Sequence, residues 1–359
     1  MRVNSEIRIL VVNTGATSTK IAVFHGENQL FSGNLRLDEG DLSRFPDVYA
    51  QKDFRLSQVQ DCLRAKNLSA RDFSAAAAIG GLLKPLASGT YRVNEKMLDD
   101  LSKGICGSHA SNLGAIIAHE MVNPFGLPVF VTDPVSVDEL SETARLSGHA
   151  EIDRVCLSHA LNTKAAAKRF AAETNRSYTD LRLIVIHFGT GISVSAHEKG
   201  RMIDVNNSME EGPMGMDRAG GVPVMQLLKL AFSGKYSPDL IKRMLFGEGG
   251  VYSYLNTRDL NEVMKMIDLG DERARAICDS MVYQAAKEAG AMAAVLRGKV
   301  DAVILTGGMT NEERVTASIA GYVSFIAPVV IYKGEDEMRA LAEGALRVLL
   351  GEEDALEYK

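Results

Sequence analysis

Several signatures that assign a function directly are missing from this 359-residue chain. Its four cysteines are far apart and form no Cys-x-x-Cys pair, so neither a structural zinc site nor a disulfide framework is expected, and a reducing cytoplasm is the predicted compartment. No His-Glu-x-x-His spacing occurs, which argues against a dedicated zinc site. No apolar run approaches the ~20 residues of a membrane helix, and the N-terminus leads into a strand pattern rather than a signal peptide.

An excess of basic charge is also missing. The 40 lysines and arginines are outnumbered by 46 aspartates and glutamates, the two signs are interspersed, and the net charge is −6. A nucleic-acid partner is therefore not expected, since phosphate backbones require a basic stripe. Hydrophobic residues make up 46% of the chain, and its length favours two domains of an ordinary globular protein without a low-complexity linker.

The most informative segment is Ile9–Phe24, which predicts a buried strand, a tight turn of small and hydroxyl-bearing residues, and a second strand. It is not a Walker loop, because Gly-x-x-x-x-Gly-Lys-Ser/Thr is absent and no helix follows Lys20. The turn Asn13–Lys20 instead predicts a hairpin whose N–H groups and hydroxyls face an anion, with a lysine at its edge. An ordinary N-terminal hairpin is the structural alternative.

The same pattern returns in the second half of the chain. Leu183–Ile186 predicts a strand, His187–Gly191 a turn and Ile192–His197 another strand, so we expect an internal duplication in which each domain opens with a phosphate-facing hairpin. A third buried strand, Asp301–Leu305, runs into the turn Thr306–Thr310, as strands do at the ligand sites of open α/β sheets. Helices are predicted over Leu42–Lys66, Asn94–Lys103, Asn112–Asn123, Asn162–Thr174 and Val222–Arg297, from Asn311 onward, and over Glu337–Leu350.

Three such turns in this order resemble the superfamily of acetate and sugar kinases, actin and heat-shock ATPases. Within it, the chain is similar, nearly end to end, to the butyrate kinases of the acetate kinase family. The resemblance implies an α/β fold with two ribonuclease-H-like, actin-type domains, with mixed sheets and flanking helices around a central nucleotide cleft. The segments that carry it are Gly80–Leu86, Ser108–His119, Thr132–Glu139, Gly200–Asn207 and Leu305–Gly308.

The resemblance also implies an organisation and a reaction. An N-terminal acid-kinase domain is expected at 1–181, on which the closing segment 337–359 can pack, and a C-terminal nucleotide-binding domain at 182–336. The implied enzyme uses ATP and Mg²⁺ to phosphorylate butyrate or a similar C3–C5 acid, giving an acyl phosphate and ADP reversibly. A homodimer is expected by the same analogy. Acetate or propionate remain alternative substrates, and a sugar kinase is less favoured.

Individual residues receive roles from the resemblance. The catalytic set is Asp133, Arg218, His159 and His187. The nucleotide is assigned to Asn13, Gly15, Ser18, Lys20, Gly189, Gly191, Gly307 and Gly308. The acyl substrate is assigned to His109, Gly80 and Gly81, and the metal to Asn13, Asp133 and Glu337, with Glu335 close enough to replace Glu337. Taken singly, several have ordinary explanations, since an aspartate before proline forms turns and a glutamate favours a helix start.

Departures from the family pattern also fall on these working segments. Ile79 stands where the family has an arginine before the Gly80-Gly81 pair, and Ala16 stands where the first hairpin has a serine. In related phosphoryl transfer, an arginine finger is worth about 10³–10⁵ in rate. A second interpretation therefore stays open, in which the chain binds nucleotide without useful turnover and serves as a binding or regulatory protein.

The substitution Ile79→Arg tests whether the missing cation limits the chemistry. If it does, the variant has a higher kcat/KM for the carboxylic acid, because the new guanidinium stabilises charge on the transferred phosphoryl group. The measurement is the initial rate of ADP formation, with Ile79→Met as an uncharged control of similar length. An unchanged or lower kcat/KM would show that the site works without this cation.

Overall fold

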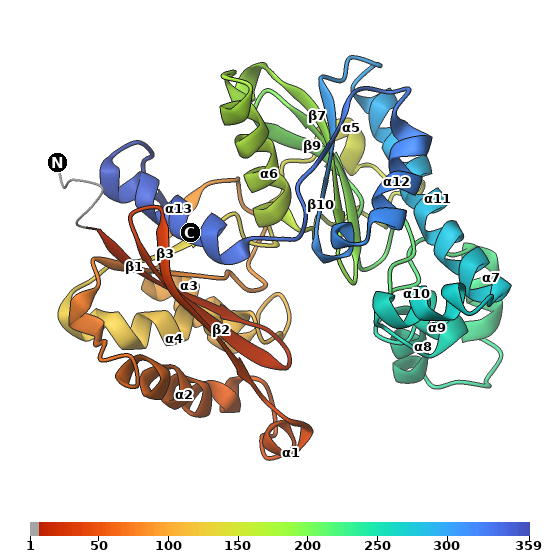
Figure 1. The fold of residues 1–359 in the computed structure, drawn as a ribbon. Coiled ribbons are helices and arrows are strands. Elements are labelled where there is room, and N and C mark those ends of the chain that lie inside the picture. Colours follow the sequence, from red (N-terminus) through yellow and green to blue (C-terminus); the bar gives the residue numbers. More distant parts are fainter. Residues whose placement is uncertain (1–6) are drawn as a thin grey trace. The chain divides into compact units, whose positions relative to one another are not determined.

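The computed structural model describes residues 7–359 and divides them into two compact units (Figure 1). The first unit contains residues 7–138 and Asp336–Lys359, and the second contains Glu139–Glu335. The sequence analysis placed the boundary after residue 181, whereas the structure groups residues 139–181 with the second unit. The physical reason is that helix α6 (Ala160–Glu173) packs against strands β7 and β10 of that unit.

The first unit is built on a seven-stranded mixed sheet in the order β12-β5-β6-β4-β1-β2-β3. Strands β1, β2 and β3 form an antiparallel meander, while β4 runs parallel to β1 and β6 runs parallel to β4. The carboxyl ends of β1, β4 and β6 therefore lie at one edge of the sheet. The strands are β1 (Arg8–Thr14), β2 (Ser18–His25), β3 (Asn28–Arg36), β4 (Ala75–Ala78), β5 (Thr90–Arg92), β6 (Val129–Thr132) and β12 (Leu356–Glu357).

Helices cover both faces of this sheet (Figure 1). Helix α4 packs on β1, β4 and β6, with α2 beside it on β2 and β3, and α13 packs on the same central strands from the other face. The strands between these layers are almost wholly apolar and buried, as expected for parallel strands covered on both sides. The helices of this unit are α1 (Glu39–Leu42), α2 (Lys52–Arg64), α3 (Glu95–Lys103), α4 (Asn112–Val122) and α13 (Glu337–Leu350).

The second unit contains a five-stranded sheet in the order β11-β10-β7-β8-β9. Helix α6 covers β7 and β10 on one face, and α11 covers β7 and β8 on the other. Its strands are β7 (Arg182–Phe188), β8 (Ile192–Glu198), β9 (Arg201–Val205), β10 (Ala302–Thr306) and β11 (Val329–Ile331). Its remaining helices are α5 (Glu142–Arg145), α7 (Val224–Ala231), α8 (Pro238–Leu245), α9 (Gly250–Leu255), α10 (Leu260–Asp268), α11 (Glu272–Val295) and α12 (Glu313–Val323).

The two sheets share one topology, which confirms the predicted duplication. In each, an antiparallel three-strand meander is extended by two parallel strands: β4 and β6 beside β1, and β10 and β11 beside β7. The hairpins β1-β2 and β7-β8 occupy equivalent places. Both carry the turns that the sequence assigns to phosphate.

Several predicted helices are shorter than expected, for identifiable reasons. The stretch Leu42–Lys66 becomes helical as α2 at Lys52, because Pro46 lacks the N–H that a helix interior needs. The region Val222–Arg297 divides into five helices, with Asn256 and Gly270 in left-handed conformations between them. After Gly307 a 3₁₀ turn (Gly308–Asn311) precedes α12. Within residues 7–359, every helix is too short or too polar to cross a membrane.

Helix α13 approaches the first sheet so closely that one of its residues must be glycine. A Cβ at Gly344 would lie 2.1 Å from the Thr132 hydroxyl oxygen of β6. We expect Gly344→Ala to lower the free energy of unfolding by about 1–3 kcal/mol, because the helix must move off the sheet. The matched control is Gly290→Ala in α11, where nothing lies within 4 Å of the added carbon.

For Gly290→Ala we expect a gain of up to about 1 kcal/mol, since alanine is the better helix former. Calorimetric unfolding of both variants measures the two effects in one chain. Equal stability of Gly344→Ala and the parent protein would contradict this account of α13.

Candidate active site

The first hairpin places the predicted phosphate residues on one face of the first sheet. Asn13 on β1 is directly opposite Lys20 on β2, and Ser18 lies two residues from Lys20 on the same strand face. Asn13 is buried, with 7% of its surface exposed, and its amide nitrogen donates to Glu337 Oε2 at 2.7 Å. Because Glu337 begins α13, this face of the hairpin is the one that α13 covers.

The contact between Asn13 and Glu337 brings together two of the three predicted metal residues. Both come to the same place from opposite ends of the chain. Glu335, the predicted alternative, lies in the second unit, where its Oε2 is 3.6 Å from His187 Nε2. The structure thus associates Glu337 with Asn13.

Asp133 lies at the same sheet edge, directly after β6. It is 2% exposed and adopts a positive φ of 40°, an unusual conformation for a residue with a side chain. Its Oδ1 accepts hydrogen bonds from the Ser88 hydroxyl at 2.6 Å and the Gly89 amide at 2.8 Å. A strained, buried carboxylate held by two donors is a feature of functional sites. The sequence analysis did not identify Ser88.

Gly80 and Gly81 allow a tight passage between β6 and α4. A Cβ at Gly80 would lie 2.5 Å from Pro134 and Val131, and one at Gly81 would lie 2.2 Å from Asn112 Oδ1. Side chains are therefore excluded from this loop by packing. This packing explains the two glycines without a substrate. It therefore does not test their predicted role in binding the acid.

Ile79 and His109 lie around the start of α4. Ile79 is 9% exposed, and a Cβ at Gly114 of α4 would lie 2.7 Å from its Cγ2 atom. His109 precedes the helix, with Nδ1 at 2.8 Å from the Ser111 hydroxyl. Lys84, the cation nearest to Ile79 in the sequence, lies 3.3 Å from the buried carboxylate of Asp100. Lys84 therefore forms an ion pair with Asp100, which Lys96 also contacts.

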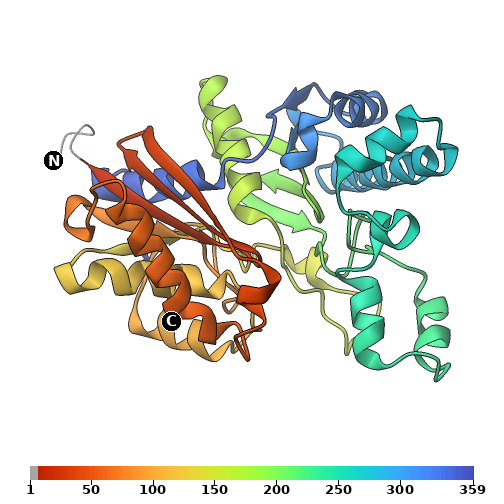
Figure 2. The same ribbon diagram turned by 60° about the horizontal axis from the view of Figure 1, so that its bottom comes forward.

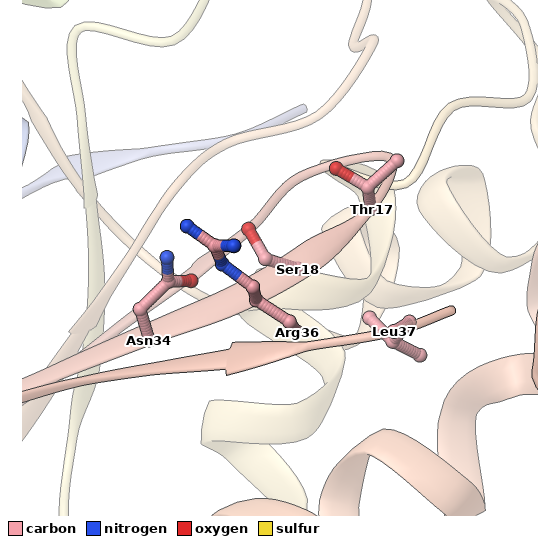
Figure 3. A pocket seen from close by; sticks show the side chains of 5 residues that line it. All are labelled: Thr17, Ser18, Asn34, Arg36 and Leu37. Carbon is pink, nitrogen blue, oxygen red and sulfur yellow. The ribbon is translucent and has the colours of Figure 1, made fainter. Parts of the chain in front are cut away.

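A small pocket lies beside the first turn, between the turn and strand β3 (Figure 3). Arg36 on β3 is opposite Ser18 in the strand register, and Asn34 is opposite Lys20. Figure 3 shows the side chains of Ser18, Asn34 and Arg36 on the same side of the strands. Thr17 and Leu37 complete the lining. Arg36 thus adds a cation beside the predicted phosphate residues, and the alternation of strand β3 was the sequence signal for it.

In the second unit, two histidines stack next to the second hairpin turn. The rings of His159 and His187 have centroids 4.1 Å apart and an interplanar angle of 22°. His159 Nδ1 is 2.8 Å from the Ser193 hydroxyl. His187 is 1% exposed and its Nδ1 is buried without a hydrogen-bond partner among the described residues. A buried ring nitrogen without a hydrogen bond is unusual and marks this position as a candidate for function.

Both histidines are held neutral. Burial, together with the nearby charge of Arg218, lowers the pKa of His187 to about 3. Burial also lowers the pKa of His159 well below its usual value, with His187 and Arg218 acting in the same direction. A neutral imidazole donates one hydrogen bond without adding a charge.

Arg218 lies directly over the second turn. A Cβ at Gly191 would lie 2.3 Å from Arg218 Nη1, so glycine is required for this approach. Arg218 Nη1 donates to the Ser208 hydroxyl at 3.0 Å, whereas the buried Nε forms no hydrogen bond with the described residues and lies 3.8 Å from Asp217 Oδ1. Burial lowers the pKa of Arg218 and the neighbouring Asp217 opposes this. A half-satisfied guanidinium next to a glycine turn is suited to receive an anion.

The structure therefore brings His159, His187, Gly191 and Arg218 together within the second unit. Gly189 belongs to the same turn, and a Cβ there would lie 2.9 Å from His187 Nε2. Gly307 has a φ of 99° and lies against the backbone of Phe188, so the third turn adjoins the second hairpin. A side chain at Gly308 would meet nothing within 4 Å, which leaves space beside this turn.

The predicted metal residues present the ligand type that Mg²⁺ prefers. Asn13, Asp133 and Glu337 offer amide and carboxylate oxygens, and Mg²⁺ is commonly held by one or two carboxylates together with waters and substrate phosphates. Among residues 7–359, no three histidine, cysteine, aspartate or glutamate side chains form a dedicated cage. The residues present fit a metal that arrives with a nucleotide.

Two sheets of one topology, each with a glycine-containing turn at its first hairpin, define the two-domain fold of acetate and sugar kinases, actin and related ATPases. The acetate kinase of Porphyromonas gingivalis superposes with a TM-score of 0.77 at 18% identity, covering 96% of this chain and 100% of that one. A propionate kinase from Francisella tularensis gives a TM-score of 0.72 at 18% identity, covering 94% and 98%. These likenesses confirm the predicted fold class.

The sequence comparisons narrow the class to a family. A model described as the Acetokinase family matches residues 154–327. Butyrate kinase 1 of Clostridium acetobutylicum is 47% identical over 353 residues, which cover 98% of this chain and 99% of the relative. Butyrate kinase 2 of the same organism is 47% identical over 355 residues, covering 99% and 100%. The chain belongs to the Acetokinase family.

The buried neutral histidines predict a pH dependence of stability. Since the folded-state pKa of each lies below the unfolded value near 6.5, the folded chain binds fewer protons than the unfolded chain as the pH falls below this value. Their stabilising contribution is present above about pH 6.5 and is lost as the pH falls through each folded-state pKa, which is about 3 for His187. The slope is up to about 1.4 kcal/mol per pH unit for each histidine.

Chemical denaturation between pH 5 and 8 measures this slope. His197 lies outside the candidate site, and burial lowers its pKa well below the usual value. We expect His197→Gln to reduce the slope, because it removes one of these buried rings. Equal slopes in the parent and the His197→Gln variant would contradict the assignment of neutral buried histidines.

Proposed function

We propose that this chain is a short-chain carboxylate kinase that transfers the γ-phosphoryl group of ATP to butyrate or a similar C3–C5 acid. The products are an acyl phosphate and ADP, and the reaction is reversible. The observation that carries the proposal is the 47% identity, along nearly the whole chain, to two butyrate kinases. The arrangement of charges and donors in each unit supports it.

The chemistry requires donors and cations rather than a base. A carboxylic acid with a pKa of about 4–5 is already ionised at pH 7, so no proton has to be removed before attack. The obstacle is repulsion between the carboxylate and the polyphosphate, which the protein overcomes by stabilising charge at the transferring group. Neutral histidines and an arginine are well suited to this task.

In the proposal, Arg218 stabilises the transferring phosphoryl group. Its guanidinium is fixed over Gly191, and its buried Nε forms no hydrogen bond with the described residues, although Asp217 Oδ1 lies 3.8 Å away. An oxyanion can therefore accept a hydrogen bond from Nε that no internal group accepts. His159 and His187 donate hydrogen bonds to phosphate or carboxylate oxygens in their neutral forms. Because neither ring titrates near neutral pH, these donors remain unchanged across the physiological range.

The remaining assignments concern the nucleotide and its metal. Asn13, Ser18 and Lys20 bind phosphate at the first hairpin, Gly189 and Gly191 bind it at the second, and Gly307 and Gly308 border the adenosine. When bound, Mg²⁺ supplies positive charge that neutralises phosphate oxygens. Asn13 and Glu337, which already share a hydrogen bond, and Asp133, which Ser88 and Gly89 orient, would hold this ion. His109, Gly80 and Gly81 would border the acid.

We further propose that the enzyme is a cytoplasmic homodimer. The four cysteines are free thiols, as expected in a reducing compartment. Helix α7 exposes several large apolar side chains, a feature typical of a subunit interface. These are Val224, Met225, Leu228 and the adjoining Phe232. Light scattering of the purified chain would determine the oligomeric state.

The deciding experiment measures ADP release from Mg²⁺-ATP with a series of C2–C5 acids, with hydroxylamine to trap the acyl phosphate. We expect a maximum at butyrate, because each methylene contributes about 1–3 kcal/mol of selectivity in an apolar pocket. Asp133→Ala should lose most of the activity and controls for contaminating kinases. A maximum at acetate would identify a different acid specificity.

Absence of acyl phosphate from the parent protein, at high enzyme concentration, would contradict the proposed activity. Calorimetric binding of ATP by that inactive protein would then identify a nucleotide-binding homologue. Ile79 and Ala16 are the residues that would explain such a result.

A further inference from the structure

Arg55, on helix α2, is a buried cation without a carboxylate partner. Its side chain is fully enclosed, at 0% exposure, and no aspartate or glutamate among the described residues forms an ion pair with it. Its Nε and Nη2 donate to Gln51 Oε1 at 3.1 and 2.9 Å. Burial of a charge without a counter-charge is unfavourable, so the position requires an explanation.

The explanation begins with the other hydrogen bonds of Arg55. Its Nη1 donates to the carbonyl oxygens of Gly15 and Ser18 at 3.0 and 3.1 Å, and its Nη2 donates to that of Ala16 at 3.1 Å. The fourth carbonyl of the turn, on Thr17, accepts from the Leu37 amide at 2.9 Å. Every carbonyl of residues 15–18 is therefore occupied, three of them by one guanidinium.

The amide groups of the same turn, unlike its carbonyls, are only partly hydrogen-bonded. Gly15 donates its N–H to the Ser18 carbonyl at 2.8 Å. Within residues 7–359, the N–H groups of Ala16 and Thr17 form no hydrogen bond. A turn whose carbonyls are occupied and whose amides are open has the polarity of an anion-binding turn.

Arg55 reaches this turn from the face opposite the predicted phosphate residues. Arg55 Nη1 contacts the Thr19 hydroxyl at 3.1 Å, and Thr19 alternates with Ser18 and Lys20 along β2. Helix α2 runs along this face of the strands (Figure 2). Ser18 and Lys20 project from the face where Asn13 meets α13. The guanidinium is thus behind the turn and the phosphate residues are in front of it.

Packing alone does not account for an arginine here. Arg55, Val59 and Leu63 form the buried stripe of α2 at i, i+4 and i+8. The other two members are apolar, as a helix that only packs on a sheet would have throughout. Burial lowers the pKa of Arg55, which reflects the missing counter-charge.

We propose that Arg55 is a positioning residue for polyphosphate binding at the first hairpin. It holds the carbonyls of residues 15–18 inward, leaves the Ala16 and Thr17 amides outward, and places a fixed positive charge behind them. The phosphate chain of a nucleotide supplies the missing counter-charge across the turn. This inference rests on the proposed function, in which that turn binds ATP.

The test compares Arg55→Lys with the parent in the full chain. Titration calorimetry measures binding of tripolyphosphate, and initial rates yield KM for ATP and for butyrate. We expect Arg55→Lys to weaken tripolyphosphate binding and raise KM for ATP roughly 10- to 100-fold, because an ammonium cannot hold three carbonyls in a fork. KM for butyrate should change by less than about 2-fold, since the proposed function assigns the acid to His109, Gly80 and Gly81 and not to this turn.

Three further variants calibrate the result. Lys20→Met shows the size of effect when a direct phosphate contact of the same turn is removed. Ser69→Ala removes the hydroxyl that caps the short helical turn before β4, at the end of that strand remote from the first hairpin turn. This variant reports the effect of a general loss of stability. We expect its affinity for tripolyphosphate to be unchanged. Thr19→Val keeps the side-chain shape but removes one acceptor of Arg55, and we expect a roughly 2- to 5-fold loss of tripolyphosphate affinity.

The outcomes separate a positioning role from a structural one. A lower melting temperature with unchanged affinity for tripolyphosphate and unchanged KM for ATP, in Arg55→Lys and Thr19→Val alike, would overturn the inference. If Arg55→Lys does not fold, Thr19→Val decides by the same criterion. Absence of tripolyphosphate binding to the parent protein also overturns it. Binding without acyl phosphate formation would reject the proposed function while supporting the role of Arg55.

Discussion

A turn suited to phosphate exposes its amides while its carbonyls are satisfied elsewhere, and the first hairpin of this structure meets that constraint. At the first hairpin the carbonyls are taken by Arg55 and by the Leu37 amide. At the second, the Thr190 carbonyl accepts from the Met216 amide at 2.9 Å, and glycine at position 191 leaves room for Arg218. In both turns, the peptide units are oriented by side chains or amides that are distant in the sequence.

Charge is used differently in the two repeats. In the first unit, Lys20 and Arg36 lie at accessible positions beside the turn, and the buried cation is behind it. In the second unit the cation, Arg218, is in front of the turn, and the flanking histidines are neutral because burial disfavours their charged forms. A duplicated backbone therefore carries two distinct electrostatic designs. We infer that one is suited to holding a polyphosphate and the other to a group that is transferred.

Much of the fold could be predicted from local pattern. Apolar strands followed by glycine-containing turns, repeated in both halves, were sufficient to anticipate the duplication and the fold class. Segment lengths were less predictable, since Pro46, Asn256 and Gly270 end helices that the apolar periodicity alone would extend. The domain boundary after residue 181 differs from the observed grouping because packing of α6 on β7 and β10 cannot be read from sequence order.

The sequence by itself determined the family, the strand-and-turn repeat and the identities of the residues proposed to act, because these depend on local spacing and on motif order. Only the tertiary structure decided which of these residues are in contact with one another. It brought Asn13 to Glu337 from opposite ends of the chain, placed Arg218 over Gly191, and stacked His159 on His187. It also brought Arg55 to the carbonyls of the first turn, a contact that a helical stripe does not distinguish from a core position. Burial and hydrogen-bond partners are long-range properties, and they arise only when distant segments pack together.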